Sequence, residues 1–155
     1  MSAADVSCFD ATAERETCER AAVVAEVLTW LRTPYHHHAR LKGVGVDCLM
    51  LLCEVYERAG LVPHIDPGDY APQWGLHRDE EIYLAGLEAY AHPVQTPGLG
   101  DVAAFRFGRT FSHAGIFVEP GLLVHAYIGA HVMHTRLTEE PLCGRPVRFY
   151  SVWGA

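Results

Sequence analysis

The residues best suited to chemistry are an Asp–Cys pair, Asp47 and Cys48, at the start of an apolar, helix-patterned segment. A loop that contains two glycines, Gly43–Val46, precedes them. A thiol in the first turn of a helix faces unpaired backbone N–H groups and the positive end of the helix dipole, which favour the thiolate. Because the thiolate is the reactive form, Cys48 is predicted to be a nucleophile. A second cysteine, Cys53, lies among apolar residues and is predicted to pack in the core.

Two histidines, His113 and His125, are predicted to lie on neighbouring strands of a β-hairpin and are candidate proton carriers for this thiol. If Val118 pairs with Leu122 across the turn, the histidines share one face as diagonal neighbours, about 7–8 Å apart at Cα, and Gly115 leaves space between them. A slip of one residue would place them on opposite faces. On a shared face, one imidazole can accept the thiol proton while the other accepts a hydrogen bond from its far nitrogen. The alternative is two unrelated histidines on a half-exposed strand.

Helices followed by strands are predicted to position these side chains. Apolar residues at helical spacing indicate the helices, and β-branched or aromatic runs separated by Gly or Pro indicate the strands. This order is typical of an α+β domain in which N-terminal helices pack on a five- to six-stranded antiparallel sheet. The predicted helices are Glu14–Arg32, Asp47–Ala59 and Arg78–Ala91, and after a linker-like segment, Pro93–Gly100, the predicted strands are Asp101–Phe107, Ser112–Val118, Leu122–Tyr127, His131–Leu137 and Val147–Trp153.

Length and composition favour one globular domain over residues 1–155, with residues 1–13 as a loose N-terminal extension. The net charge of −7 argues against a nucleic-acid binder and against binding to an anionic membrane. The sequence has no signal-peptide pattern and no segment apolar enough to span a bilayer, so we expect synthesis in the cytoplasm without membrane insertion. Five cysteines at irregular spacing fit free thiols better than a disulfide framework.

Five short motifs occur in one order along the chain: Thr33–Tyr35, Asp47–Cys48, Gly100–Val102, Ser112–Phe117 and Val124–Ala126. Their order resembles the NlpC/P60 family of papain-like cell-wall cysteine peptidases. The resemblance covers about Trp30–Trp153, which is most of the chain. It implies a papain-like fold for the predicted α+β domain.

The resemblance implies a Cys-His-His triad. Carried over by position, Cys48 is the nucleophile, His113 the general base and acid, and His125 the residue that orients His113. Tyr35 matches a family tyrosine beside the thiol, whose hydroxyl helps to hold the oxyanion together with the backbone N–H of Cys48. Such a donor contributes about 2.7–4 kcal/mol in other enzymes. The implied substrate is a peptidoglycan stem peptide, cleaved at the D-glutamyl–diaminopimelate bond.

Asp47 and Ser112 match positions that help to recognise the peptide in family members. For Asp47, the alternative is a helix N-cap. Trp74 is a candidate wall of the substrate cleft, although a Trp in a loop more often packs over the edge of a core. Leu49 and Met50 stand where the family usually has Ser-Gly, which predicts a narrowed or reshaped cleft.

The segment Asp69–Glu81 looks like the branch of the family found in phage tails and gene transfer particles. This branch implies phage tail proteins as partners and a virion-associated enzyme. A second interpretation is therefore a non-catalytic structural or assembly component of a tail, with the same fold.

A third interpretation is a metal site that uses His36–His38 together with Cys48 or with the strand histidines, His113 and His125. Contiguous histidines do not easily ligate one ion, and the sequence has no Cys-x-x-Cys pair and no His-x-x-x-His pair on one helix. The sequence therefore predicts no metal and no cofactor.

Overall fold

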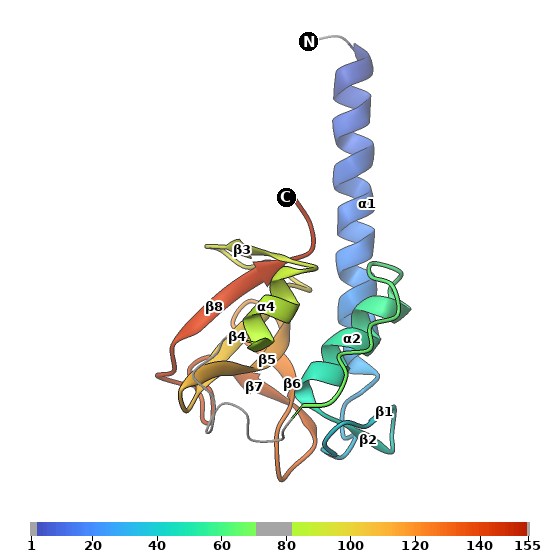
Figure 1. Ribbon diagram of the computed structural model, residues 1–155. Coiled ribbons are helices and arrows are strands. Elements are labelled where there is room, and N and C mark those ends of the chain that lie inside the picture. Colours follow the sequence, from blue (N-terminus) through green and yellow to red (C-terminus); the bar gives the residue numbers. More distant parts are fainter. Residues whose placement is uncertain (1–2, 71–81, 155) are drawn as a thin grey trace.

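The computed structural model describes residues 3–70 and 82–154 and shows helices packed against a sheet (Figure 1). Helix α1 (Ala3–Leu28) and helix α2 (Cys48–Arg58) contact each other, and both contact strand β5 (Thr110–Glu119). A short helix, α4 (Ile82–Glu88), also contacts β5. The N-terminal part of α1 extends well beyond the sheet (Figure 1).

The remaining strands are β1 (Arg40–Leu41), β2 (Gly45–Val46), β3 (His92–Val94), β4 (Val102–Phe107), β6 (Leu122–Ala126), β7 (Val132–Arg136) and β8 (Val147–Ser151). Strands β1 and β2 form a small hairpin just before α2. The others join β5 in a six-stranded sheet of order β3-β8-β4-β5-β6-β7, in which every neighbouring pair is antiparallel. The predicted α+β architecture, with helices on a five- to six-stranded antiparallel sheet, is confirmed.

The structure differs from the predicted elements at both ends of the first helix. This helix begins at Ala3, so residues 3–13, expected to be loose, are helical, and it ends at Leu28 rather than Arg32. Arg32 has φ 71°, which a right-handed helix does not allow. The third predicted helix is observed as Ile82–Glu88, and its predicted start lies outside the described residues.

Strand β3 lies partly in the segment predicted as a linker. Its central residue is Pro93, which has no N–H to donate and is therefore typical of turns and linkers. Because β3 is at the edge of the sheet and pairs only with β8, a proline is tolerated there.

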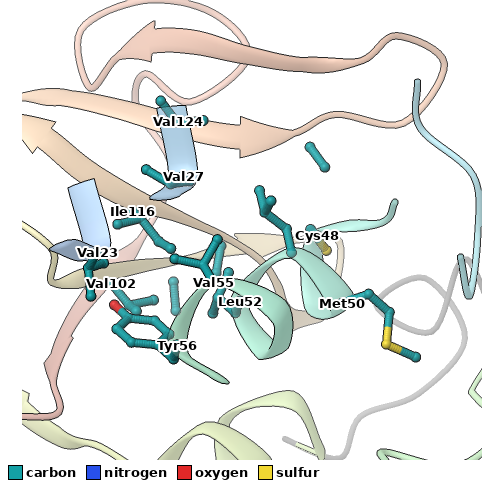
Figure 2. Close-up of a cluster of buried hydrophobic side chains, with 14 of the residues drawn as sticks. Val23, Val27, Cys48, Met50, Leu52, Val55, Tyr56, Val102, Ile116 and Val124 are labelled. Carbon is teal, nitrogen blue, oxygen red and sulfur yellow. The ribbon is translucent and has the colours of Figure 1, made fainter. Parts of the chain in front are cut away.

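The main core lies between the two long helices and the sheet (Figure 2). Val27 of α1 and Val55 of α2 pack there with Ile116 of β5, and all three side chains are fully buried. Full burial of such a side chain contributes about 1.5–3 kcal/mol. This packing holds α2 over β5, and it thereby places the start of α2 close to the strand that carries His113.

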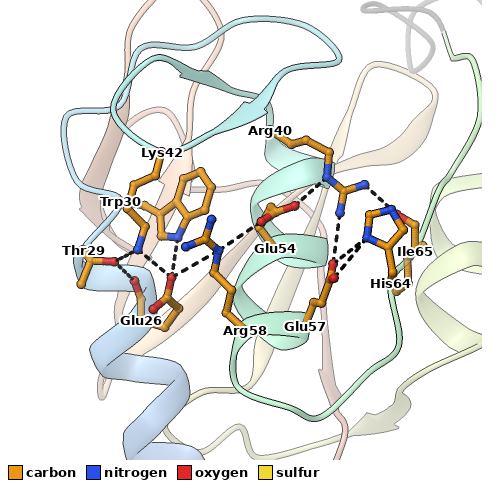
Figure 3. Close-up of polar contacts among 10 residues, drawn as sticks. All are labelled: Glu26, Thr29, Trp30, Arg40, Lys42, Glu54, Glu57, Arg58, His64 and Ile65. Carbon is orange, nitrogen blue, oxygen red and sulfur yellow. Dashed lines mark hydrogen bonds and ion pairs between the residues drawn. The ribbon is translucent and has the colours of Figure 1, made fainter.

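A network of ion pairs holds the loop before α2 against both long helices (Figure 3). Arg40 in β1 donates a 2.6 Å hydrogen bond to Glu54 of α2, and Lys42 donates a 2.8 Å hydrogen bond to Glu26 of α1. Arg58 of α2 pairs with Glu54 at 3.1 Å. These partly buried contacts fix the path of the chain that leads into Asp47 and Cys48.

Candidate active site

Cys48 is the first residue of α2 and is 8% exposed. Its Sγ lies 3.7 Å from the carbonyl oxygen of Ser112, and the backbone N–H of Ala114 also hydrogen-bonds to the thiol. The sulfur therefore packs against the β5 backbone on both sides of His113.

The resting thiol is protonated, in contrast to the thiolate expected at a helix start. Burial, together with the negative charge of Asp47, raises the pKa of Cys48 to about 12. Hydrogen bonds from the backbone N–H of Ala114, the hydroxyl of Tyr83 and the backbone N–H of Cys48 lower the pKa only in part. The expectation was wrong because desolvation of a buried anion outweighs the helix dipole and these donors. A nucleophilic attack by Cys48 thus requires a base that removes the proton as the attack proceeds.

A buried chain of hydrogen bonds joins three strands behind the thiol. Nε2 of His113 lies 2.8 Å from Nδ1 of His125, and Nε2 of His125 lies 2.8 Å from Oγ1 of Thr135 on β7. His113 is 7% exposed, His125 is fully buried and Thr135 is 3% exposed. If Thr135 accepts a hydrogen bond from Nε2–H of His125, then Nδ1 of His125 accepts one from Nε2–H of His113, and Nδ1 of His113 keeps a free lone pair. In that tautomer His113 can act as a base.

Sheet register brings the two histidines together. The pairing of Ile116 with Val124 is the register predicted for the hairpin, although an irregularity nearer the turn pairs Glu119, rather than Val118, with Leu122. A Cβ added to Gly115 would lie 3.1 Å from the Cβ of His125. The space that glycine was expected to provide is thus occupied by His125 itself.

Both histidines are neutral at neutral pH. Burial, reinforced by the charges of His125 and Arg145, holds the pKa of His113 well below its usual value. Burial alone lowers the pKa of His125 to about 4. A neutral thiol and a neutral imidazole favour proton transfer during attack over a stored ion pair.

Three tyrosines lie around the nucleophile. Burial raises the pKa of Tyr35, and the charges of Cys48 and Asp47 raise it further, which shows that its half-buried hydroxyl is close to both groups. Tyr83 of α4 hydrogen-bonds to the thiol, and Tyr70 hydrogen-bonds to Asp47. Tyr35 belongs to a family motif and Tyr70 to the segment Asp69–Glu81, whereas Tyr83 belongs to neither.

The Asp47 carboxylate is buried and already has several protein donors. Oδ1 accepts a 2.8 Å hydrogen bond from the backbone N–H of Met50, which makes Asp47 the N-cap of α2. Oδ2 accepts hydrogen bonds from the backbone N–H of His38 at 2.8 Å and from the hydroxyl of Tyr70 at 2.5 Å. Only 2% of the side chain is exposed. The capping alternative is therefore present in the structure, and it leaves little of the carboxylate for a substrate.

The remaining predicted site residues are less closely engaged. Ser112 presents its carbonyl to Cys48, and its hydroxyl lies 3.4 Å from the carbonyl oxygen of Phe107. Met50 is buried in the core, whereas Leu49 lines an apolar cavity of about 290 Å³ between α2 and α4. Trp74 lies outside the described residues.

The sequence analysis did not predict the contacts that Thr135 and Tyr83 make at the candidate site. Thr135 pairs with Leu123, which lies two residues before His125, so Thr135 and His125 are diagonal neighbours on adjacent strands. A register predicted for all three strands could have revealed this contact. Tyr83 reaches the thiol through tertiary packing of α4, and the sequence holds no local signal for that contact.

His36–His38 do not form a metal centre with Cys48. Among residues 3–70 and 82–154, no three side chains of His, Cys, Asp or Glu converge as metal ligands. Over the same described residues, no helix combines the length and apolarity needed to cross a membrane.

Comparison with characterised sequences identifies relatives that are named as endopeptidases. The chain is 31% identical over 109 residues to a protein named probable endopeptidase from Mycobacterium bovis, and equally to one from Mycobacterium tuberculosis. The alignment covers 70% of this chain but only 23% of each relative.

Solved structures share the fold. NlpC2 from Trichomonas vaginalis aligns with a TM-score of 0.64 and 17% identity over 85% of this chain and 45% of its own. The NlpC/p60 domain of the peptidoglycan hydrolase SagA aligns with a TM-score of 0.57 and 20% identity over 83% of this chain and 96% of its own. The model of the NlpC/P60 family matches residues 32–148, a range that includes Cys48, His113, His125 and Thr135. The chain therefore belongs to the NlpC/P60 family of cell-wall peptidases.

Proposed function

We propose that the protein is a cysteine peptidase that hydrolyses amide bonds of peptidoglycan stem peptides. The observation that carries the proposal is the position of the Cys48 thiol against the β5 backbone beside His113, whose ring is held by His125 and Thr135. Membership of the NlpC/P60 family and the endopeptidase relatives support the same reaction class.

In the proposed reaction, Sγ of Cys48 attacks the amide carbonyl carbon while Nδ1 of His113 accepts the thiol proton. The hydroxyl of Tyr35 and the backbone N–H of Cys48 donate hydrogen bonds to the oxyanion. Collapse breaks the C–N bond, and His113 returns its proton to the leaving amine. Water then attacks the thioester with His113 again as base, which releases the carboxylic acid and restores the thiol.

The substrate class rests on family membership and on SagA, whose NlpC/p60 domain belongs to a peptidoglycan hydrolase. The D-glutamyl–diaminopimelate bond is part of this proposal through the resemblance of the motifs. Leu49 contributes an apolar side chain to the cavity between α2 and α4, whereas Met50 is buried in the core. A reshaped cleft remains the expected consequence of both residues.

The Cys48→Ala variant is expected to abolish hydrolysis of purified peptidoglycan and of synthetic stem peptides, measured by mass spectrometry of the products. Cys53→Ala is the matched control, since Cys53 lies on the same helix, is also buried, and has no part in the proposed reaction. Hydrolysis that persists in Cys48→Ala would refute the assignment of the nucleophile.

Wild-type protein that leaves both substrates intact would favour the alternative, a non-catalytic tail component. The tail-associated setting and its protein partners depend on the segment Asp69–Glu81, most of which lies outside the described residues. This setting therefore remains a prediction, and detection of the protein in purified particles would test it.

A further inference from the structure

We infer that the hydroxyl of Tyr83 is a catalytic group, which donates a hydrogen bond to Sγ of Cys48 and stabilises that sulfur as a thiolate. The inference rests on the proposed peptidase function and deepens it, because it assigns a side-chain donor to the reacting sulfur itself. Tyr35 is the donor proposed for the oxyanion. The two tyrosines therefore act on different atoms of the same reaction.

The first argument is the set of contacts around the sulfur. The thiol of Cys48 lies 3.7 Å from the carbonyl oxygen of Ser112, which accepts its proton in a hydrogen bond. The backbone N–H of Ala114 and the hydroxyl of Tyr83 donate hydrogen bonds to the sulfur. When the thiol loses its proton, the contact with Ser112 loses its donor. The bonds from Ala114 and Tyr83 remain and become stronger, because their acceptor is now charged.

The second argument is that Tyr83 keeps its proton. The side chain is 3% exposed and packs in the same core cluster as Cys48. Burial, reinforced by the charges of Cys48, Cys53 and Asp47, holds the pKa of Tyr83 well above its usual value. The phenol is therefore a hydrogen-bond donor to the sulfur and does not compete with His113 as a base. Its burial also means that water does not readily replace it.

The third argument is the cost of forming a thiolate in this place. Burial, together with the charge of Asp47, raises the pKa of Cys48 to about 12, so a donor that reaches the sulfur without water offsets a large desolvation cost. The sulfur carries negative charge in both halves of the proposed reaction. It forms a thiolate as His113 takes its proton, and when the thioester C–S bond breaks, the electron pair stays on Sγ. One donor stabilises the sulfur in both steps.

The roles of the two tyrosines can be separated by chemistry. Iodoacetamide alkylates a thiolate by forming an S–C bond with loss of iodide, and no oxyanion appears. A group that acts on the sulfur affects both this alkylation and peptide hydrolysis. A group that acts on the oxyanion affects hydrolysis alone.

The test is the rate at which iodoacetamide labels Cys48 near neutral pH, followed by peptide mass spectrometry. Tyr83→Phe removes the hydroxyl and keeps the ring. Loss of a hydrogen bond to a charged group lowers the thiolate population about tenfold, while the thiolate that remains is about threefold more nucleophilic. Labelling of Cys48 should therefore fall about threefold, and kcat/KM for stem peptides should fall about threefold or more.

Cys53 is the reference thiol within the same molecule, since it is buried on the same helix and lines the cavity that Tyr83 also lines. Its labelling should not change in Tyr83→Phe. Tyr56→Phe is the matched control, because it removes a buried hydroxyl near the other end of α2 whose partner is the carbonyl oxygen of Gly100 (Figure 2). It should lower stability to urea and leave the labelling of both thiols unchanged. Tyr35→Phe should slow hydrolysis and also leave the labelling of Cys48 unchanged.

Two labelling results in Tyr83→Phe would overturn the inference. One is an unchanged rate for Cys48. The other is a faster rate for both Cys48 and Cys53, which would mean that the hydroxyl holds α4 in place and that its loss opens the cavity. If Tyr83→Phe does not fold, a ring-fluorinated tyrosine at this position keeps the shape and donates more strongly. It should speed the labelling of Cys48, and an unchanged rate would again contradict the inference.

The labelling rate does not depend on hydrolysis, so the two proposals can fail separately. If wild type cleaves no peptide but labelling of Cys48 falls in Tyr83→Phe, the proposed function fails and the stabilisation of the thiolate by Tyr83 stands. If wild type cleaves peptides and Tyr83→Phe leaves either kcat/KM or the labelling of Cys48 unchanged, the inference about Tyr83 fails alone.

Discussion

The two flanks of the nucleophile are built in different ways. On the strand side, His113, His125 and Thr135 come from adjacent strands, and the sheet register alone brings them together. On the loop side, Tyr70 and His38 approach Asp47 from separate loops, held by ring contacts and hydrogen bonds. On the strand side, the residues proposed for proton transfer follow from the register of the sheet. The loop side covers a charge and depends on tertiary packing.

The largest effect is expected on the strand side. His113→Ala removes the base that a protonated, buried thiol requires, so kcat/KM for stem peptides should fall by about 10²–10⁴-fold. The control is His134→Ala, because His134 is exposed on the neighbouring strand β7. If His113→Ala retained full activity, another group would have to accept the thiol proton of Cys48. The assignment of proton transfer to the strand side would then be wrong.

The buried histidines should also make folding stability depend on pH. Because burial lowers the pKa of His125 to about 4, the unfolded chain binds a proton more readily than the folded protein. Stability is therefore fully present above about pH 6.5 and falls as the pH drops toward 4, by about 3 kcal/mol for this group.

Urea unfolding at several pH values measures this loss. His125→Asn should flatten the acid side of the profile, whereas His134→Asn should not. An equal slope in wild type and His125→Asn would mean that His125 is not buried in the neutral form.

The smallest expected effect lies at the far end of the hydrogen-bond chain. Thr135→Val keeps the shape of the side chain but removes the acceptor for His125, so His113 loses its preferred tautomer and kcat should fall about tenfold. Thr135→Ser restores the hydroxyl and should restore most of the rate. A similar loss in both variants would point to altered packing rather than to the hydrogen bond.

What the sequence could predict divides in a similar way, between features set by local patterns and features set by contacts of distant segments. The sequence left the hairpin register conditional on a Val118–Leu122 pair. The structure has the Ile116–Val124 pair that this register implies, but it pairs Glu119 with Leu122. Because β5 is buried at nearly every position, its pattern alone does not exclude a slip of one residue. The start of α2 at Cys48, in contrast, is local, since Asp47 caps it and an apolar helix pattern follows. The α+β fold class depends on the order of such elements and was predictable for the same reason.

What the sequence did not reveal depends on contacts between distant segments. The pKa of Cys48 depends on how completely the sheet and helices exclude water, so the helix dipole alone predicted the wrong charge state. Tyr70 and Tyr83 reach Asp47 and Cys48 from loops and a short helix whose paths no periodicity specifies. The roles of Cys48, His113, His125, Tyr35 and Ser112 in the reaction remain predictions that the proposed variants test.

Gly115 has no side chain, and this limits the substitutions that the fold can accept at this position. A methyl group there would sit 3.1 Å from both the Cβ of His125 and the carbonyl oxygen of Val124, closer than well-packed atoms normally approach. Alanine at this position would require these atoms on the neighbouring strand to move by a few tenths of an ångström. His125, one of those neighbours, contacts His113, so a residue with no reactive atom constrains the contact between the imidazoles through its lack of volume.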